Sequence, residues 1–83
     1  MSLKNQHVVV TGGGSGIGKA IAIYAAKKGA KISILARNKI RLEAVVSEIE
    51  SLGGEAQAIS CDVQKKENVF QAFKKAVETF GDI

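Results

Sequence analysis

A glycine-rich segment near the N-terminus has the residue types that a phosphate-binding turn requires. Residues 11–18 read Thr-Gly-Gly-Gly-Ser-Gly-Ile-Gly. Glycine allows positive φ angles and, because it lacks a Cβ atom, lets a ligand approach the backbone closely. A helix that starts in such a segment presents unpaired N–H groups and the positive end of its dipole to an anion. One charge at a helix N-terminus contributes about 0.3–1 kcal/mol, so other residues must help to hold a large ligand.

The patterns on either side of this segment predict a strand before it and a helix after it. Residues 7–10, His-Val-Val-Val, form a short apolar run that is typical of a buried strand. A helix is predicted over residues 16–28, with Gly29 as its stop. Its expected apolar face consists of Ile17, Ala20, Ile21, Tyr24 and Ala25. The glycines therefore lie in a strand-to-helix turn, which is the context that favours a phosphate site.

The remaining chain alternates between strand and helix patterns. Strands are predicted over residues 31–36 and 56–60. Asn38 is a good N-cap for a second helix, which ends at the glycine pair 53–54 and has the apolar residues Leu42, Val45, Val46, Ile49 and Leu52. A third helix is predicted from residue 65 to about residue 80, after the poor cap Gln64, with the apolar residues Val69, Phe73, Ala76, Val77 and Phe80. Such alternation with short connections predicts an α/β fold with parallel strands and right-handed crossovers.

Composition limits the classes of function. A chain of 83 residues is one small domain or part of a larger one. The net charge of +4 comes from lysines scattered along the chain, without a cluster of basic residues and stacking aromatic residues, so no nucleic-acid partner is expected. No apolar run approaches the ~20 residues of a membrane span, and no signal peptide is predicted, although a membrane-associated full-length protein stays open. The single cysteine, Cys61, fits the cytoplasm and is expected to be buried filler, and no metal site is predicted.

Two kinds of phosphate-binding loop compete for the glycine segment. Gly13 to Gly18 followed by Lys19 fits the start of a nucleoside-triphosphate P-loop, but Ala20 stands where that loop needs a Ser or Thr hydroxyl for magnesium. The spacing T-G-x-x-x-G-x-G, formed by Thr11, Gly12, Gly16 and Gly18, fits without such a gap. With this motif the chain resembles the short-chain dehydrogenase/reductase family.

Further residues extend the resemblance over the whole chain. They are the pair Ala36-Arg37 at the end of the second strand and the pair Asp62-Val63 after the third. The resemblance implies a Rossmann-type, three-layer fold, with this chain as its βαβαβα half in strand order 3-2-1. Residues 1–83 would be a partial dinucleotide-binding domain, about a third of a family member, truncated before strand 4. Strand 1 would then have an unpaired apolar edge, and the isolated chain would be unstable or self-associate.

The resemblance also implies which residues bind a dinucleotide. Gly12, Gly16 and Gly18 would make the turn, admit the pyrophosphate and allow close helix–strand packing, with Gly14 in the same loop. Ile17 would lie beside the pyrophosphate through its backbone, and Ser15 would reach the ribose or its phosphate. Asp62 would accept a hydrogen bond from the adenine amino group and Val63 would flank the ring. The alternative for Asp62 is a carboxylate that caps its own loop.

The end of the second strand favours NADP(H) over NAD(H). An NAD site needs an acid there, and this chain has none between Leu35 and Glu43. Arg37 can bind a 2′-phosphate, with Asn38 and Ser15 in support. A charge-assisted hydrogen bond of about 1.5–3 kcal/mol gives roughly a 10- to 100-fold preference for NADP. The alternative for Arg37 is a solvated cation at a helix start.

No catalytic residue is predicted in this chain. Tyr24 and Lys28 have the family's Y-x-x-x-K spacing, but they lie on the first helix, whereas the family's pair lies on a much later one. The resemblance therefore implies the NADP(H)-binding N-terminal portion of an oxidoreductase that transfers hydride between NADPH and a ketone or secondary alcohol. The 3-ketosphinganine and 3-oxoacyl reductase branches look most similar, and a homo-oligomer is expected for the full-length protein. The alternatives are a non-catalytic dinucleotide-binding module and, with less support, a P-loop NTPase.

Overall fold

The chain folds into three strands and three helices that alternate along the sequence. The computed structural model describes residues 2–12, 16–62 and 64–83. The elements are β1 (His7–Thr11), α1 (Gly16–Lys27), β2 (Lys31–Ala36), α2 (Lys39–Ser51), β3 (Glu55–Ser60) and α3 (Lys66–Phe80). The strands form one parallel sheet in the order β1-β2-β3, which confirms the predicted α/β fold and strand order. Among the described residues, no helix is long and apolar enough to cross a membrane.

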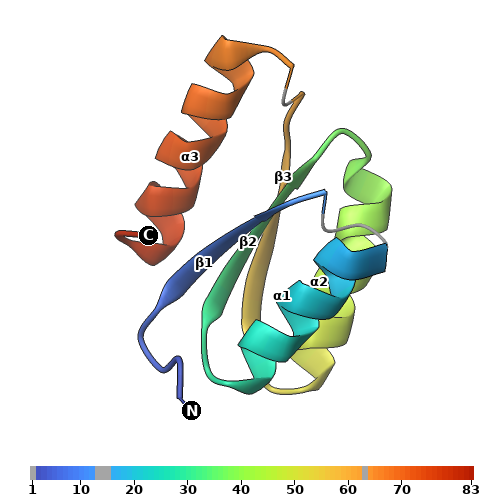
Figure 1. The fold of residues 1–83 in the computed structure, drawn as a ribbon, viewed down its shortest axis with the longest axis vertical. Coiled ribbons are helices and arrows are strands. Elements are labelled where there is room, and N and C mark those ends of the chain that lie inside the picture. The colour runs from blue at the N-terminus through green and yellow to red at the C-terminus, as the bar shows by residue number, and fades with distance from the viewer. Residues whose placement is uncertain (1, 13–15, 63) are drawn as a thin grey trace.

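The helices cover both faces of the sheet. Figure 1 shows α1 and α2 on one face and α3 on the other. The larger core lies under α1 and α2, where Ile32 and Ile34 of β2 are fully buried against Leu42 and Ile49 of α2. A smaller core under α3 contains Leu35, Ile59 and Cys61. Because both faces are covered, the four central residues of β2, 32–35, are all buried.

The first helix packs on the sheet through a different face from the predicted one. Its buried residues are Ala22, Ala25 and Ala26, whereas Ile17 is 80% exposed and Ile21 and Tyr24 are 50% exposed. Alanine lets the helix approach the sheet closely, so small residues, and not the larger apolar ones, mark the contact face. The apolar stripe predicted for this helix is therefore wrong except at Ala25.

Two smaller corrections concern helix ends. Leu52, predicted in the apolar face of α2, is 53% exposed because it lies past the last helical residue, at the C-cap. Lys65, and not Gln64, is the N-cap of α3, and its side chain makes no capping hydrogen bond. The predicted cap of α2 is confirmed, since the Asn38 side chain accepts a hydrogen bond from the Arg41 N–H group at 3.2 Å.

A chain of buried and half-buried polar side chains crosses the sheet on the α3 face. His7 Nε2 lies 2.7 Å from Ser33 Oγ, and Gln57 Nε2 donates to the same oxygen at 2.9 Å. His7 Nδ1 lies 2.8 Å from the Gly81 carbonyl oxygen, just after α3. The His7 ring also meets the Phe80 ring edge-on, with 5.4 Å between centroids. This network, which the sequence patterns did not reveal, joins all three strands to the C-terminal end of α3.

Candidate functional site

A cavity of about 410 Å³ lies at the carboxyl ends of the three parallel strands. Its walls include Thr11, Gly12, Arg37, Cys61, Asp62 and Gln64. In-register parallel pairing of β1 with β2 and of β2 with β3 brings these strand ends to one edge of the sheet. In open α/β sheets, ligands bind in the crevice outside this edge. Three of the predicted site residues, Gly12, Arg37 and Asp62, thus meet at one cavity.

The turn after β1 has the backbone geometry that glycine permits. Gly12 has φ 69° and Gly16, the first residue of α1, has φ 59°. Chain neighbours aside, no atom of the described residues lies within 4 Å of a Cβ atom built at either position, so the backbone conformation explains these two glycines. The Gly12 N–H group donates to the Leu35 carbonyl at 2.8 Å, which joins the turn to β2. Gly12 therefore shapes the turn but has no free N–H group for a phosphate.

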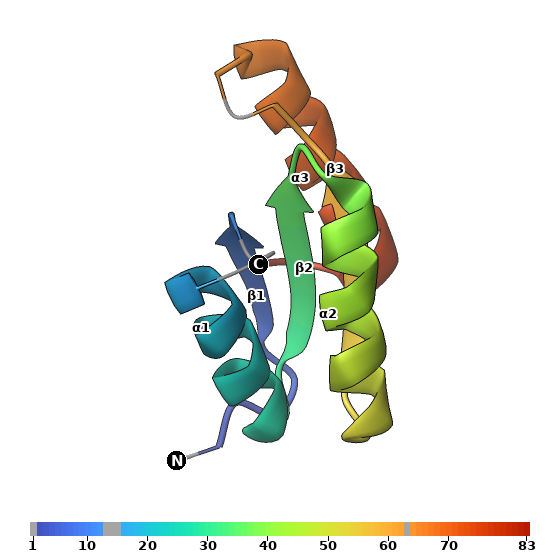
Figure 2. The ribbon, with the colours of Figure 1, turned by 90° about the vertical axis from the view of Figure 1, so that its right-hand side faces the viewer.

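The N-terminus of α1 is the element that can receive an anion. Figures 1 and 2 show that α1 begins at the end of the sheet where β1 and β2 terminate. Its first turn, which contains Ile17 and Gly18, has no acidic residue. The N–H groups of a first helical turn lack intrahelical partners and carry the positive end of the dipole. Gly14, Ser15 and Val63, also predicted to bind the cofactor, lie outside the described residues.

Arg37 and Asp62 form an ion pair at this cavity. Arg37 Nη2 donates to Asp62 Oδ2 at 3.2 Å, with the Arg37 side chain 70% exposed and that of Asp62 19% exposed. The Gln64 N–H group donates to Asp62 Oδ1 at 3.0 Å, so the carboxylate also caps its own loop. These two contacts, first the Gln64 N–H group and then Arg37, hold the pKa of Asp62 below its usual value. The contact with Gln64 is the loop-capping role that the sequence gave as the alternative for Asp62.

Two other residues near the site have structural roles. Asn38 uses its side-chain oxygen to cap α2, which leaves its amide N–H groups for other contacts. Cys61 is 2% exposed in the core under α3, as expected for buried filler. Burial, with a smaller contribution from the neighbouring Asp62 charge, raises the pKa of the Cys61 thiol. A neutral, buried thiol is a poor nucleophile, so Cys61 contributes packing and not chemistry.

The tyrosine–lysine pair with catalytic spacing lies elsewhere. Tyr24 and Lys28 do not line the cavity at the strand ends, and the Lys28 ammonium lies over the Tyr24 ring, 5.3 Å from its centroid. This is a cation–π contact on an exposed helix face. Lys19, which the P-loop alternative requires at the phosphates, instead pairs with Glu48 of α2 at 3.4 Å. Among the described residues, no cluster of His, Cys, Asp and Glu could hold a metal ion.

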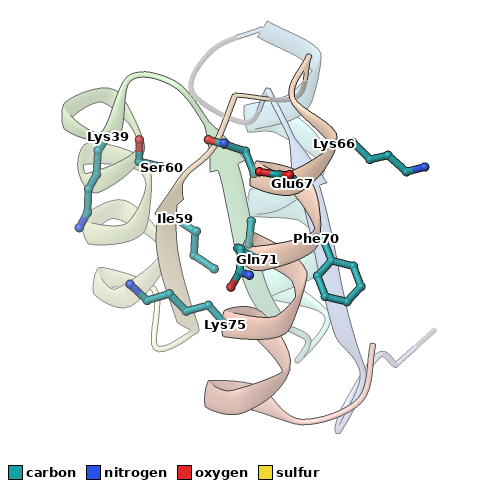
Figure 3. A pocket seen from close by; sticks show the side chains of 10 residues that line it. Lys39, Ile59, Ser60, Lys66, Glu67, Phe70, Gln71 and Lys75 are labelled. Carbon is teal, nitrogen blue, oxygen red and sulfur yellow. The ribbon is translucent and has the colours of Figure 1, made fainter.

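A larger cavity, of about 840 Å³, lies between α3 and the outer edge of β3. Its walls include Lys39, Ser60, Glu67, Gln71 and Lys75 (Figure 3). Lys75 extends from α3 across β3, whereas Phe70 points to the other side of the helix. The two cavities have no lining residue in common among the described residues, and none of the described residues predicted to bind cofactor lines the larger one. We therefore place the candidate site at the smaller cavity.

Comparison with known proteins shows the family of this chain. A family model described as short chain dehydrogenase matches residues 6–83. The chain belongs to the short-chain dehydrogenase/reductase family. It corresponds to the N-terminal part of this oxidoreductase family, the part in which members bind NAD(P).

Individual relatives of the short-chain dehydrogenase/reductase chain show how much of the fold is present. This chain is 40% identical over 83 residues to an uncharacterized oxidoreductase, Lmo0432, of Listeria monocytogenes. The match covers 100% of this chain and 34% of that protein. It is 42% identical over 76 residues to a 3beta-hydroxysteroid dehydrogenase of Mediterraneibacter gnavus, covering 92% and 28%. A metagenomic short-chain oxidoreductase solved in complex with NADP superposes with TM-score 0.92 at 36% identity, covering 98% and 37%. The chain thus spans about a third of the length of these relatives.

Proposed function

We propose that this chain is the NADP(H)-binding part of a reductase that transfers hydride between NADPH and a ketone or secondary alcohol. The observation that carries the proposal is Arg37, an exposed guanidinium at the end of β2 and on the wall of the strand-end cavity. No carboxylate follows on the same strand end before Glu43, so nothing on β2 opposes a 2′-phosphate. Residues 1–83 would form part of one dinucleotide-binding domain.

The predicted residues fit such a cofactor. The glycine turn leaves space beside Gly12 and Gly16, and the N-terminus of α1 can receive the pyrophosphate. The contacts with the adenosine half that the family resemblance implies are assigned to Ser15, Asn38, Asp62 and Val63. When bound, the nicotinamide supplies the hydride. This chain's own residues bind and orient the adenosine half.

The named relatives add support for the substrate class. The Mediterraneibacter protein is called a 3beta-hydroxysteroid dehydrogenase, a name that describes oxidation of a hydroxyl group. We extend this chemistry to the present chain as a carbonyl or alcohol substrate, with the 3-ketosphinganine and 3-oxoacyl reductase branches as candidates. A cytoplasmic location and a homo-oligomeric full-length protein belong to the same proposal.

The cofactor assignment is tested by exchanging the charge at the end of β2. In the complete polypeptide that contains this chain, Arg37→Asp removes the phosphate-binding cation and introduces the acid of an NAD site. The dissociation constant for NADPH relative to NADH should rise roughly 10- to 100-fold, because a charge-assisted bond of about 1.5–3 kcal/mol is lost. The measurement is fluorescence or calorimetric titration with both cofactors.

A matched control is Lys4→Asp, which makes the same charge change at an exposed residue before β1, at the opposite end of the sheet. It should leave the NADPH-to-NADH ratio unchanged. An unaltered ratio in Arg37→Asp would refute the assignment of the 2′-phosphate to Arg37. Binding without turnover of any ketone or alcohol would favour the non-catalytic module over the reductase.

A further inference from the structure

Arg37 and Asp62 contact each other at the mouth of the strand-end cavity. They come from the ends of neighbouring strands, where Ala36 of β2 is in register with Ser60 of β3. Both line the cavity, and the Nη2–Oδ2 distance is 3.2 Å. Two residues predicted to bind the adenosine half therefore contact each other.

The two side chains differ in how many contacts hold them and in how exposed they are. Asp62 is fixed from a second side by the Gln64 N–H group, at 3.0 Å from Oδ1, and only 19% of its side chain is exposed. The Arg37 side chain is 70% exposed. Among the described residues, its guanidinium forms one hydrogen bond, the one to Asp62. The Arg37 side chain is thus the partner that can change position, whereas the Asp62 side chain stays in place.

The contact and the phosphate compete for the same cation. In the pair, the carboxylate offsets the guanidinium charge and accepts one of its N–H groups. A 2′-phosphate brought to Arg37 in this position would also lie near the Asp62 carboxylate, and like charges repel. A ligand without the 2′-phosphate needs nothing from Arg37 and can enter while the pair stays closed.

We propose that Arg37 and Asp62 form a closed pair that the adenosine half of NADP opens by partner exchange. Arg37 moves from Asp62 to the 2′-phosphate, whereas Asp62 can accept from the adenine amino group in either state, because each carboxylate oxygen can accept more than one hydrogen bond. Asp62 is then a specificity residue that restrains 2′-phosphate binding. This inference rests on the proposed function, because it assigns regulation to the same cofactor site.

The size of the restraint follows from the strength of an exposed ion pair. Such pairs favour the closed state by a factor of roughly 1.4 to 5. The affinity of a ligand that requires the open state falls by the fraction that is open. The pair therefore weakens binding of the 2′-phosphate by about two- to six-fold.

The test compares two half-cofactors, adenosine 2′,5′-bisphosphate and adenosine 5′-monophosphate, by calorimetric titration of the complete polypeptide. The ratio of their dissociation constants isolates the 2′-phosphate, because both carry the same adenine. Asp62→Asn removes the anionic partner and keeps an amide oxygen for the adenine. It should raise the preference for the bisphosphate about two- to six-fold. In the Arg37→Ala background only the repulsion between the Asp62 charge and the phosphate remains, so Asp62→Asn should raise the preference less than it does in the wild-type protein.

Two controls make the result specific. Glu48→Gln removes one negative charge from another exposed ion pair, with Lys19 at 3.4 Å on the helices α1 and α2, and should not alter the ratio. NMR titration provides a measurement without ligand: the pKa of Asp62, held low by the Gln64 N–H group and by Arg37, should rise in Arg37→Ala.

Each other outcome overturns a defined part of the argument. An unchanged or lower preference in Asp62→Asn refutes the restraint, and a lower one would mean that Asp62 orients the guanidinium toward the phosphate. An Asp62 pKa that does not move in Arg37→Ala refutes the pair itself. A wild-type protein that binds both half-cofactors equally refutes the proposed NADP function, while the pKa measurement still tests the pair.

Discussion

Replacing Ser33 by alanine should destabilise the fold more than any exposed serine replacement. Ser33 is fully buried on β2, between His7 and Gln57. The Gly81 carbonyl can only accept, so we infer that His7 Nδ1 carries the proton and that Nε2 accepts from the Ser33 hydroxyl. The same hydroxyl oxygen accepts from Gln57. Ser33→Ala removes a donor and an acceptor at once.

The expected cost follows from what the replacement leaves without a partner. His7 is 5% exposed, so its Nε2 atom would be a buried, unsatisfied acceptor, which costs about 1–3 kcal/mol. Gln57 would keep only its longer contact with the Ala76 carbonyl, at 3.4 Å, and the lost bond contributes about 1 kcal/mol. The free energy of unfolding should therefore fall by about 2–4 kcal/mol.

Urea unfolding of the complete polypeptide, followed by circular dichroism, measures this difference. The matched control is Ser47→Ala on the exposed face of α2, which should change stability by no more than about 0.5 kcal/mol. A double-mutant cycle with His7→Leu adds a sharper test. Once the histidine is gone, Ser33→Ala leaves no orphaned ring nitrogen and should cost less than it does alone. Equal effects of Ser33→Ala and Ser47→Ala would refute the buried network.

Two further predictions concern pH and assembly. The folded-state pKa of Asp62 is lowered, so its contribution to stability is present above the unfolded pKa of about 3.9 and disappears as the pH falls through the folded value. Asp62→Asn should therefore flatten the acid side of the stability–pH curve, and an identical curve for both proteins would contradict the pair. The 83-residue chain alone should self-associate or unfold, because β1 pairs only with β2 among the described strands. A monomer in sedimentation velocity with one cooperative calorimetric transition would contradict this expectation.

The amino-acid sequence by itself determined the order and type of the elements. Strand and helix periods are local, and they gave all six elements within a residue or two of the observed ends. The glycine turn and the Asn38 cap were also predictable, since each depends on a few neighbouring residues. The parallel order followed from the alternation of strand and helix, because short connections leave few other topologies.

Only the tertiary structure decided which distant side chains meet. The contacts of Arg37 with Asp62 and of His7 with Ser33 span 25 and 26 residues, and no local pattern encodes them. The buried face of α1 also depends on tertiary packing. The larger apolar residues suggested one face, but the helix packs closely on the sheet through the alanines at 22, 25 and 26. Local sequence fixes backbone conformation, whereas side-chain partners depend on strand register and on helix approach. Both are set only when the whole sheet has formed.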